Sequence, residues 1–177
     1  MRFGIRRRLV IRRVAFGVLA VACALLQSIP LLPTPFGICM MPLVPLAVLL
    51  AAYEQGQPAV LFSVLGGVCW DVTAPGLSFY GVGLGALAAF CAVLFRYRVN
   101  RNALSLTVFA FGGSVFTAVL HWLGSAFSIG FPAAWESLLL QELPSVAYTM
   151  LALPILYMIL RMILKATARK RGGVRVA

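Results

Sequence analysis

The sequence predicts an all-α integral membrane protein, a compact bundle of six transmembrane helices, and three observations lead to this fold class. Hydrophobic residues make up 62% of the 177 residues, well above the roughly 45–50% apolar usage of soluble domains. The apolar residues gather in six runs, most of them close to the ~20 residues that a helix needs to cross a bilayer. The Lys and Arg residues are confined to the two ends of the chain and one short internal segment.

The positions of the basic residues predict the orientation of the chain. Their three groups cover residues 1–13, 96–101 and 161–175, and together these hold every Lys and Arg. With six spans and a cytoplasmic N-terminus, all three groups lie in the cytoplasm, as the positive-inside rule requires. If 58–74 were only a re-entrant segment, the group at 96–101 would move outside. We therefore expect six spans, with both termini in the cytoplasm.

The chain is expected to open with a basic cytoplasmic segment, residues 1–13. Its charges should attract anionic lipid headgroups, at about 1 kcal/mol each. The arginines expected at the lipid surface are Arg6, Arg7, Arg8, Arg12 and Arg13. No aromatic platform lies between them, so binding of nucleic acid is not expected. The apolar run that follows, 14–31, is interpreted as a retained first span, because prolines crowd the place where a signal peptide would be cleaved.

Three further spans are expected in the middle of the chain. The second, about 36–53, contains Pro42 and Pro45, and we expect these prolines to interrupt its helix while neighbouring helices satisfy the freed carbonyls. The third, about 58–74, is short and follows a polar turn. The fourth, about 79–95, follows a loop that contains proline and glycine.

Two spans complete the bundle, the fifth at about 103–127 and the sixth at about 143–164. The longer loop between them, 128–142, is expected to lie partly in the membrane interface. The basic residues of 165–177 form a cytoplasmic tail. The six spans then make one membrane domain, residues 14–164, which leaves no room for a separate soluble domain.

The third and fourth spans are predicted to form a tightly packed hairpin, around which the chain is organised. Gly66 and Gly67 weaken a helix but let another backbone approach closely. Small residues recur at four-residue spacing on several spans, as Ser63/Gly67/Asp71, Gly81/Gly85, Ala20/Ala24 and Gly113/Thr117. Such faces have two interpretations: packing inside this bundle, or docking of another membrane protein.

The carboxylate of Asp71 is the most expensive group in this hairpin, because facing lipid costs it about 2.5–3.5 kcal/mol at a helix centre and less near an end. It either caps the following segment or reaches the headgroups, or it is a functional intramembrane group. His121 is a candidate partner, since a carboxylate can hold an imidazole charged. Glu54, in the turn before 58–74, has two interpretations: a screened salt bridge to nearby arginines, or recognition of a cytoplasmic partner.

No residue pattern indicates an enzyme. The sequence has no nucleophilic serine elbow, no cluster of acidic metal ligands and no phosphate-binding loop with its lysine. The four cysteines lie in apolar runs without the spacing of zinc ligands. We expect no catalytic residue, no metal and no cofactor.

Three stretches nevertheless resemble a known family. Tyr53-Glu54-Gln55-Gly56 is followed by Leu65-Gly66-Gly67-Val68-Cys69-Trp70-Asp71 and then by Gly76-Leu77-x-x-Tyr80-Gly81. With the segment from Glu142 to Pro154, and with the basic ends and the order of spans, the chain resembles MreD, the rod-shape-determining membrane protein family of bacteria. The resemblance covers nearly the whole chain.

The resemblance implies a non-catalytic scaffold in the plasma membrane, within the machinery of lateral cell-wall elongation. Its expected partners are MreC above all, then the cytoskeletal MreB, the glycosyltransferase RodA and a class B penicillin-binding protein. The family's bundle is similar to the substrate-binding subunits of energy-coupling-factor vitamin transporters. Such a subunit is the alternative function, in which Ala20 and Ala24 would meet the coupling partner. A vitamin pocket needs several convergent polar groups, and this sequence offers few, so the scaffold is preferred.

Overall fold

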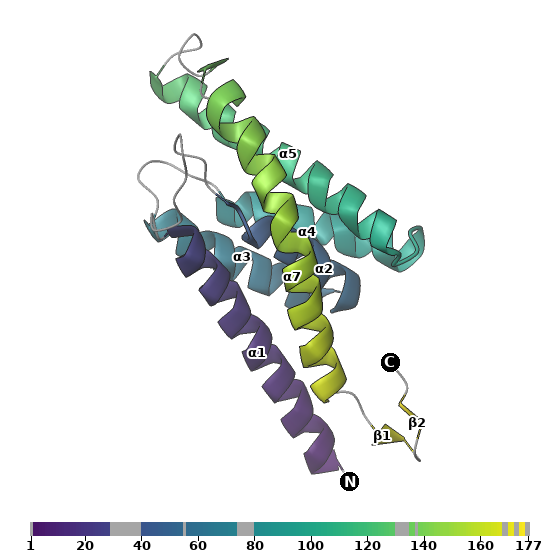
Figure 1. Ribbon diagram of the computed structural model, residues 1–177. Helices are drawn as coiled ribbons and strands as arrows, with labels where there is room; N and C mark the ends of the chain where they lie inside the picture. Colours follow the sequence, from purple (N-terminus) through teal and green to yellow (C-terminus); the bar gives the residue numbers. More distant parts are fainter. Residues whose placement is uncertain are drawn as a thin grey trace.

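The computed structural model describes residues 2–28, 40–54, 56–73, 80–129, 135–136, 138–167, 170–171 and 174–175 (Figure 1). Within these residues the fold is helical. The main helices are α1 (Arg2–Ser28), α2 (Leu43–Tyr53), α3 (Gln57–Thr73), α4 (Tyr80–Tyr97), α5 (Ala103–Ile129) and α7 (Leu143–Thr167), and a π-helical turn, η1 (Leu138–Glu142), leads into α7. Two short strands, β1 (Lys170–Arg171) and β2 (Val174–Arg175), pair antiparallel in the tail.

Four segments of the described chain are long and apolar enough to cross a membrane. They are Leu9–Gln27, Tyr80–Tyr97, Ala103–Gly124 and Leu138–Thr167. The chain is therefore a helical membrane protein with several candidate spans. The helix that the sequence predicted at 58–74 is present as α3, with 17 residues. The helix predicted at 36–53 is much shorter in the described residues.

The prolines explain where α2 begins. Pro42 is its N-cap residue, and the helix that follows has only 11 residues, or about 16 Å against the ~30 Å of a bilayer core. Pro45 lies in the first turn, where a helix does not need the backbone N–H that proline lacks. The expected interruption is therefore confirmed at Pro42, before which residues 40 and 41 are not helical, whereas the helix continues through Pro45. The preceding N–H, that of Met41, donates instead to Thr149 Oγ1 of α7 at 3.1 Å.

The hydrophobic core surrounds α2 rather than the α3–α4 hairpin. All ten residues from Leu43 to Ala52 are buried, and α2 packs against α1, α3, α4, α5 and α7. A helix that is apolar on every side is stable only inside such a surround. The sequence predicted a chain organised around the α3–α4 hairpin, and the structure corrects this, because the core is centred on α2. Helices α3 and α4 nevertheless form the most extensive helix pair.

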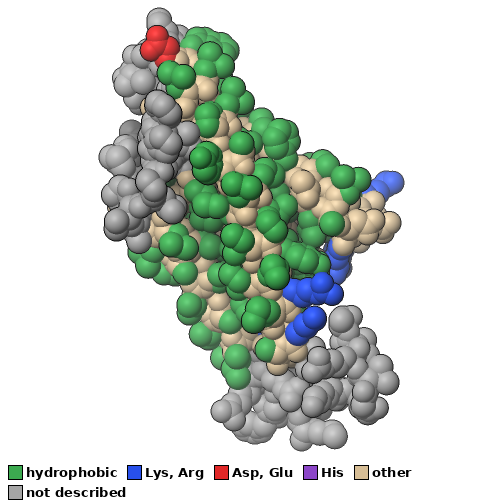
Figure 2. Space-filling model, viewed as in Figure 1, with side chains coloured by type: hydrophobic (Ala, Val, Ile, Leu, Met, Phe, Trp, Pro, Cys, Tyr) green, Lys and Arg blue, Asp and Glu red, His purple; other side chains and the backbone are tan. Residues whose placement is uncertain are grey.

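The basic side chains of the described structure lie toward one end of the molecule. In Figure 1 the start of α1 and the end of α7 lie at the same end of the bundle. Figure 2 shows Lys and Arg side chains toward that end, an acidic group at the opposite end and a largely hydrophobic surface between them. Helix α1 begins at Arg2, so helical structure continues through the basic segment 1–13. The side chains of Arg6, Arg7 and Arg8 lie outside the described part of the structure.

Candidate functional site

The α3–α4 hairpin is packed backbone to backbone at Gly67. A Cβ atom placed on Gly67 would lie 2.5 Å from the Cα atom and 2.7 Å from the nitrogen of Gly81, and 2.8 Å from the carbonyl oxygen of Tyr80. Real carbon contacts are about 3.5–4.0 Å. Only glycine therefore allows this approach. One helical turn further along, a Cβ atom on Gly85 would lie 2.5 Å from Val64 Cγ2.

The small-residue faces pack inside the bundle. A Cβ atom on Gly66 would lie 2.8 Å from Leu43 Cδ2 and 3.8 Å from Ala20 Cβ, so this glycine lies where α3 meets α2 and α1. On Gly113 it would lie 2.8 Å from a methyl group of Leu87. Buried positions on these faces also include Ala24, Ser63, Gly67, Gly81, Gly85 and Thr117. Of the two interpretations of these faces, the described structure shows helix packing.

Asp71 caps α4. Its Oδ1 atom accepts a hydrogen bond from the backbone N–H of Tyr80 at 3.0 Å, and its Oδ2 atom accepts one from Gly81 at 2.9 Å. The first N–H groups of a helix have no partner within that helix, and a carboxylate there also interacts favourably with the helix dipole. The capping interpretation of Asp71 is therefore confirmed. Gly76, predicted beside it, lies outside the described residues.

His121 pairs with Glu142 rather than with Asp71. Its Nδ1 atom contacts Glu142 Oε1 across the α5–η1 interface. The Glu142 side chain is 4% exposed, and its Oε2 atom is buried without a hydrogen-bond partner among the described residues. The π-helical turn η1 carries Glu142, and such turns are frequent at functional sites. The expected pairing of Asp71 with His121 is thus replaced by two separate interactions.

An aromatic side chain joins these two interactions into one cluster. The Tyr80 ring lies 6.2 Å from Trp70, edge to face, and 6.1 Å from the His121 ring. We call the set Trp70, Asp71, Tyr80, His121 and Glu142 the acidic-end cluster. It ties α3, α4, α5 and η1 together at the end of the bundle opposite the arginines.

A second ion pair fixes the opposite end. Arg12 of α1 contacts Glu54 in the α2–α3 turn, and the two side chains are 29% and 7% exposed. The pair was expected to be screened by water, but the low exposure of Glu54 makes it largely buried instead. The next described residue of the turn, Gly56, has a φ of 97°, a conformation that glycine adopts at little cost. Arg13, by contrast, is exposed.

Two tyrosines link this end to the basic residues of α7 and of the α4–α5 loop. The rings of Tyr53 and Tyr157 are 6.3 Å apart. Arg101 and Arg161 lie close enough for their charges to act on Tyr53. The basic end is therefore built from four parts of the chain, namely α1, the end of α2 with its following turn, the α4–α5 loop and α7.

The polar contacts described above hold helices of the bundle together. Among the described residues, no group of three His, Cys, Asp or Glu side chains lies where it could hold a metal ion. His121 and Glu142 form an acid–base pair. Among the described residues, the contacts of this pair include no nucleophilic side chain. Asp71 and Glu54 already have partners in the bundle.

The sequence carries a signal for the pairing of His121 with Glu142. His121 lies near the end of one span and Glu142 at the start of the next, so an antiparallel connection brings them to the same end. The central position of Tyr80 has no comparable signal, because it depends on how α4 packs between α3 and α5.

Comparison with protein-family models, with curated proteins and with solved structures finds no match for this chain.

Proposed function

We propose that the protein is a non-catalytic membrane scaffold of the MreD type. It would sit in the bacterial plasma membrane with both termini in the cytoplasm and would dock MreC for lateral cell-wall elongation. RodA, a class B penicillin-binding protein and MreB would be reached through that complex. The basis is the resemblance of the sequence, together with features of the bundle that suit docking better than transport or catalysis.

The observation that best supports the proposal is that most acidic side chains are engaged in contacts within the bundle. Asp71 caps α4, Glu142 pairs with His121, and Glu54 pairs with Arg12. Three of the four acidic residues of the chain therefore hold helices of the same bundle together. A polar small-molecule substrate needs convergent groups that are not already engaged in this way. A scaffold needs only a stable bundle and an exposed apolar surface.

Helix α1 supplies such a surface. Only 22% of its apolar window Leu9–Gln27 is buried, against 50% for Tyr80–Tyr97. Its exposed residues include a stripe with alternating spacings of three and four, formed by Ile11, Val14, Val18, Val21 and Leu25. This is the spacing of a helix–helix seam. It extends over about 21 Å at 1.5 Å per residue, which is more than one leaflet, and we assign it to the docking of MreC.

The transporter alternative is weakened by the burial of two alanines. Ala20 and Ala24, which a coupling subunit would contact, are 1% and 2% exposed. Ala20 lies at the α1–α3 contact beside Gly66. Helix α1 would have to leave the bundle before these residues could meet a partner.

Co-purification tests the proposal. The tagged full-length chain would be extracted from its native membranes in a mild detergent, and the proteins that remain bound would be identified by mass spectrometry. Recovery of MreC with RodA or a class B penicillin-binding protein is the expected result. Recovery of two ATPases and a coupling membrane subunit would contradict the scaffold and support the transporter subunit.

A further inference from the structure

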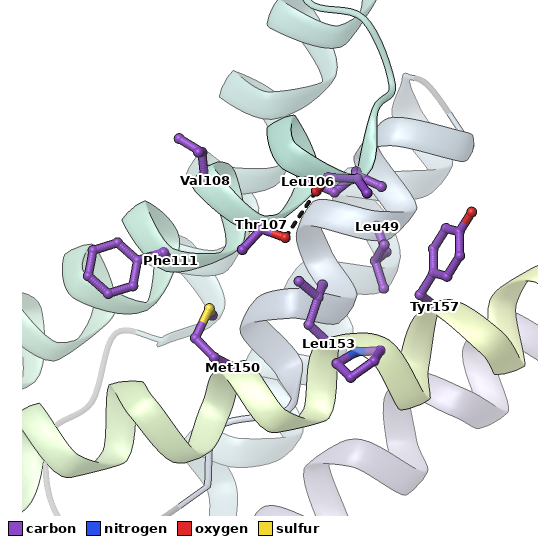
Figure 3. A pocket seen from close by; sticks show the side chains of 10 residues that line it. Leu49, Leu106, Thr107, Val108, Phe111, Met150, Leu153 and Tyr157 are labelled. Atoms are coloured by element: carbon purple, nitrogen blue, oxygen red, sulfur yellow. Dashed lines mark hydrogen bonds between the residues drawn. The ribbon is translucent and has the colours of Figure 1, made fainter.

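A groove of about 550 Å³ lies between α5 and α7. Figure 3 shows side chains of these two helices facing one another across it, with Leu49 of α2 between them. Leu49, Leu106 and Leu153 are buried, and Val108 and Phe111 are more than half exposed. The remaining lining residues are Ala103, Thr107, Met150, Pro154 and Tyr157. The Thr107 hydroxyl donates to the Ala103 carbonyl at 3.0 Å, so the groove presents a largely apolar surface.

One end of this groove lies beside two arginines. Arg101 precedes Ala103, the first lining residue of α5, by two positions. Arg161 follows Tyr157 by four positions on α7, and residues at this spacing share a helix face. Both arginines are exposed, and the ion pairs among the described residues leave both without a carboxylate partner.

The length of the groove favours a lipid chain over a protein helix. Its lining residues run from Ala103 to Phe111 on α5, which is about 12 Å at 1.5 Å per residue. A bilayer core is ~30 Å thick, so one leaflet is ~15 Å. The groove therefore covers most of one leaflet, starting from the basic end. A transmembrane helix would cross both leaflets and would contact a longer surface.

We propose that the groove binds one acyl chain of an anionic phospholipid, whose phosphate is held by Arg101 and Arg161. Basic pockets between transmembrane helices at the cytoplasmic side are suited to anionic headgroups. The apolar walls hold the chain, and the two guanidinium groups select the charge of the headgroup. This inference does not depend on the scaffold function, because it concerns a different face from the α1 stripe.

Native mass spectrometry of the full-length protein in detergent tests the site. The protein would be titrated with dioleoylphosphatidylglycerol and separately with dioleoylphosphatidylcholine. The anionic lipid should bind more tightly, and the variant Arg101→Gln/Arg161→Gln should bind it about 30-fold more weakly, because each basic residue near a membrane surface contributes roughly fivefold. The matched control Arg96→Gln/Arg98→Gln removes the same charge from neighbouring exposed positions and should change the affinity by less than about threefold.

A second pair of variants tests the apolar part independently. Val108→Trp fills the groove and should abolish retention of the lipid, whereas Val119→Trp, on an exposed part of the same helix outside the lining, should not. Equal binding of the two lipids, equal loss in the two arginine variants, or normal binding by Val108→Trp would each overturn the proposal. If the arginine variant does not purify as a folded protein, the two tryptophan variants decide the result.

Discussion

Replacing Gly67 by alanine should be one of the most damaging single-methyl changes in the protein. The new Cβ atom would lie 2.5 Å from Gly81 Cα and 2.8 Å from the Tyr80 carbonyl oxygen, so α3 and α4 must separate by about 1 Å or more. The obstruction is backbone, which cannot rotate away. Gly67→Leu should separate the helices further.

The expected loss of stability follows from three contributions. Overpacking costs about 1–3 kcal/mol. Asp71 lies one turn from Gly67 on the same face, so separation of the helices also weakens its 2.9 and 3.0 Å hydrogen bonds to the start of α4, and loss of a cap costs about 0.5–2 kcal/mol. Alanine returns up to ~1 kcal/mol through its higher helix propensity. The net destabilisation should be about 0.5–5 kcal/mol.

The assay is reversible unfolding in mixed micelles, titrated with sodium dodecyl sulfate. Gly112→Ala is the matched control, because a Cβ atom there has nothing within 4 Å, and this variant should be neutral or more stable by up to ~1 kcal/mol. Asp71→Ala measures the cap alone. Equal free energies of unfolding for Gly67→Ala and Gly112→Ala would refute the close backbone packing of α3 and α4.

Three other predictions use the same unfolding assay. In a double-mutant cycle of Arg12→Gln and Glu54→Gln, the coupling energy should be about 0.5–3 kcal/mol, since the pair is largely shielded from water; additive effects would contradict the ion pair. Gly56→Ala should lower the free energy of unfolding by about 1–2 kcal/mol, because its φ of 97° is strained for a residue with a Cβ atom, whereas Gly124→Ala should not. His121→Phe should destabilise by about 1–3 kcal/mol, because the buried Glu142 carboxylate loses its partner, and His121→Phe/Glu142→Leu should recover part of that loss. A double variant as unstable as the sum of its single changes would argue against the pairing.

The positions of most helices could be predicted from apolar runs and charges. The segments expected at 58–74, 79–95, 103–127 and 143–164 correspond to α3, α4, α5 and α7, which begin within one residue of the expected positions. Membrane helices are governed by local hydropathy and by backbone hydrogen bonds within each segment, so periodicity and length suffice to find them. The close approach at Gly67 also had a direct signal, a pair of glycines in an apolar helix.

The central position of α2 and the pairing at the acidic end were harder to predict. Pro42 and Pro45 suggested an interrupted helix, and the helix does begin only after Pro42, but Pro45 lies in its first turn, where proline is tolerated. The choice of Glu142 rather than Asp71 as the partner of His121 depends on the rotation of α5 and on the π-helical turn. Both are set by tertiary packing. The α5–α7 groove has no sequence signal, because its lining residues resemble any other lipid-facing side chains.

Site-specific photo-crosslinking in living cells tests the scaffold most directly. A photoreactive amino acid would replace Val18, which is 64% exposed on the α1 stripe, and Ala20, which is 1% exposed, would be the buried control position. We expect a crosslink from position 18 to MreC and none from position 20. A crosslink from position 18 to a transporter coupling subunit, or to no protein at all, would contradict the proposed docking surface.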